Sequence, residues 1–199
     1  MYLRALPLYA RNLGVLFAPL IAALIAIGLS YFGGWLFAPT GGMGMGLLSL
    51  IDALLYGMAF GIAVIFADDA WRHGHANLPN AWNEARRKAG SILIAVVGFY
   101  FLVWIARLVG GVLGGFAGQS EIFAYALLAL AVWAFIYTIP AAAIGGTPGG
   151  AALSASLQAA KRNPLATAIL VIVCAIVWLA LTDYAVRWLP FNEIADQIA

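Results

Sequence analysis

Long apolar stretches constrain what this chain can fold into more than any other feature. Each is close to the length that crosses a bilayer, and they lie near residues 13–36, 46–67, 90–112, 121–143 and 165–187. A hydrocarbon core of about 30 Å takes roughly 20 helical residues. A backbone in lipid must also satisfy its own hydrogen bonds, which favours helices. The sequence therefore predicts an all-α fold, a polytopic helical membrane bundle with about five transmembrane helices.

The composition argues against a soluble domain. Of the 199 residues, 65% are hydrophobic and 9% are charged, whereas soluble domains carry about 25% charged residues. The first apolar block, from Leu13 to Phe37, is too long for the core of a typical signal peptide and is interpreted as a retained span. The single cysteine, Cys174, permits no intramolecular disulfide. We expect one transmembrane domain over residues 1–199.

The distribution of Lys and Arg predicts the orientation. Eight of the ten basic residues precede the first span or lie in the connections between spans two and three and spans four and five: Arg4, Arg11, Arg72, Arg86, Arg87, Lys88, Lys161 and Arg162. Basic residues in short loops concentrate on the cytoplasmic side of a membrane. We therefore expect a multi-pass protein of the cytoplasmic (inner) membrane, with its amino terminus in the cytoplasm and its carboxyl terminus outside.

An internal repeat runs through the chain with an offset of 75 residues. A leading leucine, a later alanine and the basic residue after it recur at this spacing: Leu3, Leu78 and Leu153; Ala10, Ala85 and Ala160; Arg11, Arg86 and Lys161. Each unit is interpreted as a short amphipathic helix, a span, a glycine-rich turn and a returning span. Because each unit crosses the membrane twice, successive units share one orientation and the repeat is parallel. The units cover approximately 1–75, 76–150 and 151–199, so the third is incomplete.

The amphipathic helices predict contact with membrane lipids. The segment from about 77 to 88 places apolar residues on one side and charged residues mostly opposite, as in helices that lie in the interface. An ordinary connector packed on its own bundle fits the pattern equally well. The residues expected at lipid headgroups are Arg11, Trp82, Arg86, Arg87, Lys88, Lys161 and Arg162.

The incomplete third unit predicts a partner. Residues 165–187 form the first span of that unit without its returning span. We expect a second copy of the chain, another protein or lipid to pack against this span.

Charges inside the spans are candidate functional groups, because a charge in a bilayer is costly. Four are expected at similar depth towards the outer side: Asp52, Arg107, Asp183 and Arg187. They form either an outer polar vestibule or gate, or a structural ion pair between Asp52 and Arg107 with side chains that reach the interface, and the structural interpretation is favoured.

Small residues predict close helix packing. Gly57 and Gly61 in the second span, and Gly110 and Gly114 in the third, are each four residues apart. This spacing lets helices approach closely. Packing within the chain is favoured over dimerisation.

A cluster of carboxylates and imidazoles follows the second span, comprising Asp68, Asp69, His73 and His75. Such groups can bind divalent metals, but their spacing matches no known metal signature, so neither a metal nor another cofactor is predicted. No catalytic motif is present in the sequence, which argues against an enzyme.

The segments that begin at Leu78 and Leu153, each leading into a span, resemble the prokaryotic membrane-domain family sometimes fused to glycerophosphodiester phosphodiesterases. The resemblance implies a stand-alone prokaryotic membrane bundle with interfacial connectors. The phosphodiesterase activity itself is not implied, since the chain has no such domain.

Together these patterns favour a non-enzymatic subunit, scaffold or lipid-interacting module of a membrane assembly. The alternative is a small transporter or channel that uses the outer polar cluster. No nucleic-acid partner is expected.

Overall fold

The structure is a computed structural model that describes residues 12–37, 42–116, 118–147 and 149–188. All of its elements in these residues are helical, which confirms the all-α prediction for this part of the chain. In chain order they are η2 (Leu13–Leu16), α2 (Phe17–Phe37), α3 (Gly42–His73), α4 (Leu78–Phe116), α5 (Ser120–Phe135), α6 (Thr138–Ala143), α7 (Gly149–Arg162) and α8 (Pro164–Trp188).

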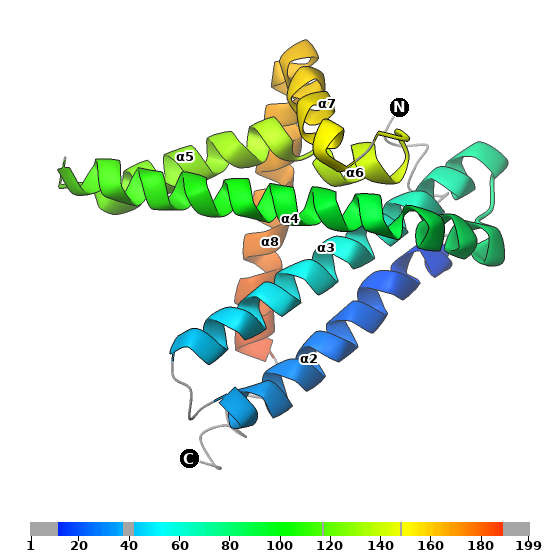
Figure 1. Cartoon of the computed structure of the whole chain (residues 1–199), viewed down its shortest axis with the longest axis horizontal. Helices are drawn as coiled ribbons and strands as arrows, with labels where there is room; N and C mark the ends of the chain where they lie inside the picture. Colours follow the sequence, from blue (N-terminus) through cyan, green and yellow to red (C-terminus); the bar gives the residue numbers. More distant parts are fainter. Residues whose placement is uncertain (1–11, 38–41, 117, 148, 189–199) are drawn as a thin grey trace.

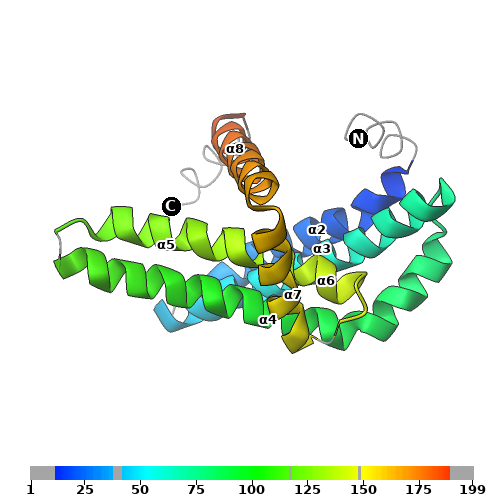
Figure 2. The ribbon, with the colours of Figure 1, turned by 90° about the horizontal axis from the view of Figure 1, so that it is seen from above.

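Two helical hairpins form the frame of the molecule. Helices α2 and α3 make one hairpin and α4 and α5 make the other, and the two diverge from the place where α3 and α4 cross (Figure 1). The short helix α6 and helix α7 pack beside this crossing, while α8 leaves in a third direction (Figure 2). The polytopic membrane bundle remains a prediction.

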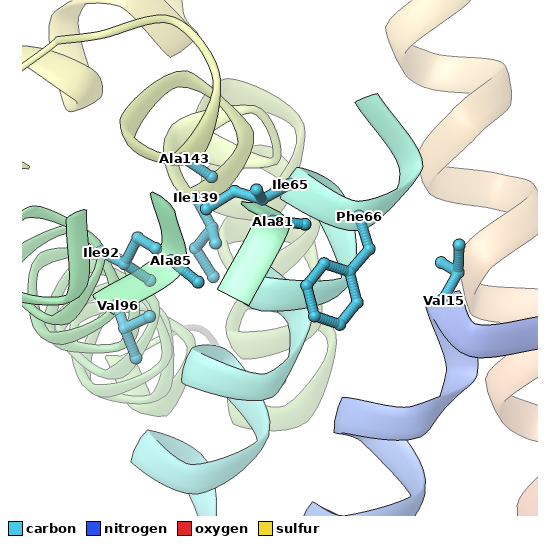
Figure 3. Close-up of a cluster of buried hydrophobic side chains, with 9 residues drawn as sticks. All are labelled: Val15, Ile65, Phe66, Ala81, Ala85, Ile92, Val96, Ile139 and Ala143. Carbon is cyan, nitrogen blue, oxygen red and sulfur yellow. The ribbon is translucent and has the colours of Figure 1, made fainter. Parts of the chain in front are cut away.

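The buried core lies where α3, α4 and α6 meet (Figure 3). It is built of small and branched apolar side chains: Val15, Ile65, Phe66, Ala81, Ala85, Ile92, Val96, Ile139 and Ala143. Gly57 and Gly61 permit the close approach of α3 to α4. A Cβ at Gly61 would lie 2.5 Å from Cγ2 of Ile92, and one at Gly57 would overlap Val96. The glycines predicted to pack helices therefore face α4 of the same chain.

Helix α4 differs from the predicted arrangement, in which a short amphipathic helix precedes a separate span. Its 39 residues form one helix without a break, because nothing between Glu84 and Gly98 interrupts the helical hydrogen bonds. At the corresponding position of the next unit, Asn163 is followed by Pro164, and α7 and α8 meet there at a bend of 108°. Proline lacks an N–H and disfavours helical conformation in the residue before it.

The predicted fourth span is also interrupted. Helix α5 ends at Phe135 and α6 begins at Thr138, because Pro140 cannot donate a hydrogen bond back into α5. The gap is closed by Ser156 of α7, whose hydroxyl donates to the carbonyl of Ala134 (3.0 Å) and accepts from the N–H of Tyr137 (3.1 Å). A buried side chain thus satisfies the backbone at the break.

Three helical segments in the described residues are long and apolar enough to cross a membrane: Gly46–His73, Leu78–Phe116 and Ser120–Ala143. The bent pair α7 and α8 makes up to four if it counts as one span, and the apolar stretch Leu13–Leu29 is shorter. These lengths suggest a membrane protein. Five spans remain a prediction.

Several positions 75 residues apart are buried in both the predicted second and the predicted third repeat unit. In three pairs of residues at this spacing, both members are no more than 3% exposed: Ala81 and Ser156, Ala85 and Ala160, and Ile92 and Thr167. Equivalent positions therefore pack inward in both units, although one unit is straight and the other is bent.

Candidate functional site

The junction between α3 and α4 is fastened by polar contacts. Gly74 adopts a left-handed conformation, with φ of 79°, at the end of α3, a conformation that glycine enters without steric cost. The side chain of Asn12 accepts a hydrogen bond from the N–H of Ala76 (2.9 Å), and Asp69 accepts one from the N–H of Asn77 (2.7 Å). These contacts hold the beginning of α2, the end of α3 and the beginning of α4 together.

The three acidic residues at this junction are all paired with neighbours one turn away. Asp68 lies 2.8 Å from Arg72, Asp69 lies 2.9 Å from Nδ1 of His73, and Glu84 lies 2.7 Å from Lys88. The two members of each pair are four residues apart on one helix. The charges of Asp68 and Glu84 are therefore compensated by Arg72 and Lys88. The charge of Asp69 is compensated when His73 is protonated.

Lys88 differs from the expectation that it reaches the membrane surface. Its ammonium group donates to the carbonyl of Ala143 (2.8 Å) in addition to pairing with Glu84. Ala143 belongs to the buried core. Lys88 therefore ties α4 to α6 instead of pointing outward.

Four other basic residues predicted at the interface are exposed. Arg86 and Arg87 lie on α4, and Lys161 and Arg162 lie at the end of α7. Within the described residues, none of the four forms an ion pair with an acidic side chain. Arg11, the remaining basic residue of this prediction, lies outside the described residues.

An apolar groove of about 350 Å³ lies between α2 and α3 and reaches the first turns of α4. Its floor is formed by small buried side chains and its walls by larger ones, of which all but Phe66 are partly exposed. The floor consists of Ala18, Ala22 and Ala59, and the walls include Phe17, Ile21, Ile25, Met58, Phe66 and Trp82. Trp82 stands at the α4 end and is 48% exposed. No charged side chain lines the groove among the described residues.

The carboxylates and imidazoles considered as metal ligands do not converge. Asp68, Asp69 and His73 line a small pocket together with Arg72 and Glu84. In the described part of the chain no three His, Cys, Asp or Glu side chains are grouped closely enough to hold a metal ion. The guanidinium group of Arg72 in the same pocket would repel a cation.

The charges predicted to lie within the membrane occupy different surroundings. One carboxylate oxygen of Asp52 is buried and has no hydrogen-bond partner among the described residues, while Arg107 is exposed. The ion pairs of the described residues do not include one between these two side chains. The backbone of Asp183 and Arg187 lies in α8, but their side chains fall outside the described ones.

The glycines of α4 face α5. A Cβ at Gly110 would lie 2.6 Å from Cα of Ala124, and one at Gly114 would lie 2.5 Å from Cα of Ser120. Both are therefore used for packing inside one hairpin. Gly111 and Gly115, on another face of the same helix, would meet nothing within 4 Å.

Comparison with known proteins adds no assignment: no family model, curated protein or solved structure matches this chain. The groove is the part of the site that the sequence patterns missed. Its signal was present, because Ala18, Ala22 and Ala26 recur every four residues within an otherwise bulky apolar helix, a spacing that places small side chains on one face.

Proposed function

We propose that this chain is a non-enzymatic integral protein of the cytoplasmic membrane that acts as a lipid-interacting module or subunit, with its basic surface towards anionic headgroups. The observation that carries the proposal is the asymmetry of charge pairing. The acidic residues at the α3–α4 junction have partners on their own helices, while Arg86, Arg87, Lys161 and Arg162 are exposed and unpaired among the described residues.

Unpaired cations at a membrane surface attract anionic lipids. Each Lys or Arg near an anionic surface contributes about 1 kcal/mol, and the attraction falls off within a Debye length. Four such side chains would give a marked preference for anionic lipids. The positive-inside rule would place all four on the cytoplasmic side.

The proposal includes five spans arranged as a parallel repeat. The shared burial of Ala85 and Ala160 supports equivalent packing in the second and third units. On α8, apolar side chains such as Leu165 and Ile176 are largely exposed, which supports lipid, a second copy or another protein as the covering of this helix.

Lipid selectivity tests the proposal directly. The full chain is reconstituted in bilayers of phosphatidylcholine with a spin-labelled lipid, either phosphatidylglycerol or phosphatidylcholine, and electron spin resonance measures the motionally restricted fraction. We expect a preference for phosphatidylglycerol that weakens as salt rises.

The matched variants separate these cations from charge in general. The fourfold change Arg86→Gln, Arg87→Gln, Lys161→Gln and Arg162→Gln should remove most of the preference. Arg107→Gln, which changes an exposed cation expected on the opposite side, should retain it. Equal selectivity for both lipids in the unaltered protein would refute the proposal.

A small transporter or channel is a second candidate, favoured by the buried oxygen of Asp52 that has no partner among the described residues. Such a group is costly unless it is protonated or reached by water or an ion. Proteoliposome flux measured for Asp52→Asn combined with Arg107→Met distinguishes the two functions. Loss of a flux in a correctly assembled variant supports transport, and the absence of any flux in the unaltered protein counts against it.

A further inference from the structure

The groove between α2 and α3 has the dimensions and the chemical setting of a site for one lipid molecule. We propose that it binds one acyl chain of an anionic phospholipid, with the lipid phosphate held by Arg86. This inference deepens the proposed function and rests on it, since it names where a specific lipid would be retained.

The length of the groove matches half of a bilayer. Its lining runs from Phe17 to Ile25 along α2 and from Phe66 to Leu55 along α3, which corresponds to roughly 12–17 Å at the rise of an α-helix. One leaflet contributes about 15 Å of hydrocarbon. An acyl chain that enters at the α4 end would therefore reach approximately the middle of the membrane.

The size of the groove favours a single hydrocarbon chain as the occupant. Its volume is about 350 Å³, whereas an α-helix about 10 Å across has a cross-section of roughly 80 Å². The small side chains of Ala18, Ala22 and Ala59 leave a channel whose lining is apolar throughout. A single hydrocarbon chain suits such a space.

The polar end of the groove lies where a headgroup would be expected. Trp82 closes that end and is half-exposed, as is typical of tryptophan at the level of headgroups. Arg86 follows it by four residues on the same uninterrupted helix, so the two side chains lie on one face, a single turn apart. Arg86 is exposed and forms no ion pair with the described acidic residues, so its guanidinium can pair with a phosphate in bidentate geometry.

The beginning of α4, at the polar end of the groove, is fixed by contacts with the residues that precede α2. Leu78 of α4 packs against Gly14, where an added Cβ would lie 3.1 Å from its Cδ2, and Asn12 bonds to the loop before α4. The first turns of α4 are thereby fixed over the beginning of α2. Arg86 is consequently held one helical turn from Trp82, which lines the groove.

Retention of lipid by the purified chain tests the inference. The protein is extracted with mild detergent from bilayers of phosphatidylglycerol and phosphatidylcholine, and native mass spectrometry counts the lipids that remain bound. We expect one phosphatidylglycerol per chain. Arg86→Gln should weaken its binding about fivefold, which equals ~1 kcal/mol for one cation at a membrane surface. Arg107→Gln, which changes an exposed cation that does not line the groove, should leave binding unchanged.

Filling the groove provides a steric test with a matched control. Ile21→Trp places a large side chain in the wall of the groove, whereas Leu20→Trp makes a similar change at the preceding position of α2, which does not line it. Retention should be lost only in the first variant. Equal retention by both variants would overturn the inference.

Crosslinking of the unaltered protein gives an answer that does not depend on folding of the variants. Phosphatidylglycerol with a photoactivatable diazirine in its acyl chain should label residues 17–25 and 55–66, and exclusive labelling of α8 would overturn the groove assignment. If spin-label selectivity for phosphatidylglycerol persists while no lipid is retained, the groove fails and the proposed function stands. If the unaltered protein shows no selectivity, both fail.

Discussion

Adjacent glycines of α4 should respond in opposite ways to the same substitution. Gly110 faces the backbone of α5, where an added Cβ would lie 2.6 Å from Cα of Ala124, whereas Gly111 faces open space. Alanine at either position gains about 0.8–1.0 kcal/mol of helix propensity over glycine. At Gly111 this gain is not opposed by any contact, so Gly111→Ala should stabilise the protein by about that amount.

The gain is offset at Gly110 because the obstacle is main chain and no side-chain rotation relieves it. The two helices would have to separate by about 1 Å to restore an ordinary contact, and overpacking of this kind costs about 1–3 kcal/mol. Gly110→Ala should therefore be less stable than Gly111→Ala by about 1–3 kcal/mol. Gly114→Ala and Gly115→Ala form a second pair with the same expected order, since only Gly114 faces α5.

Unfolding in mixed micelles by titration with sodium dodecyl sulfate measures these differences, with helicity followed by circular dichroism. The comparison within a pair removes the common effect of helix propensity. Equal stabilities of Gly110→Ala and Gly111→Ala would show that α4 and α5 do not pack in this register, and a more stable Gly110→Ala would show that the opposite face is the packed one.

Two further predictions concern the helix breaks. Ser156→Ala should destabilise the protein by about 1–3 kcal/mol, because it leaves a buried carbonyl and N–H unpaired at the α5–α6 break. Ser154→Ala, at an exposed position, should change stability little. Equal unfolding midpoints of the two variants would contradict the bridging role of Ser156. Pro164→Ala should let α7 continue into α8. With spin labels at Gly150→Cys and the native Cys174, the distance between the labels should then rise from about 21 Å towards about 36 Å, as calculated from helical rise and the bend. An unchanged distance by double electron–electron resonance would show that contacts with other helices impose the bend.

Much of the local structure follows from the sequence. The apolar stretches predicted helices, Gly118 adopts a left-handed conformation in the predicted turn between α4 and α5, and Pro164 occupies the first position of α8 as its chemistry favours. These features depend on a few neighbouring residues. They can therefore be predicted from the sequence without knowledge of any tertiary contact.

The features that the sequence did not reveal depend on contacts between distant segments. Lys88 was expected at the surface, but its partner, the carbonyl of Ala143, is 55 positions away in the chain. The groove likewise forms only when the small face of α2 is set beside Met58 and Trp82. The continuity of α4 differs from the prediction for another reason. An amphipathic and a transmembrane pattern suggest two helices, but no residue between them interrupts the backbone.

The length of α4 has a mechanical consequence. A continuous helix of 39 residues measures about 58 Å at 1.5 Å per residue, whereas a bilayer with its headgroup regions is about 40–45 Å thick. In a bilayer such a rod either extends into water or tilts by roughly 40°. A change of 10° in tilt moves one end of the rod by about 10 Å relative to the other. In a bilayer, α4 would therefore couple the thickness of the surrounding membrane to the position of the end that carries Arg86 and Arg87.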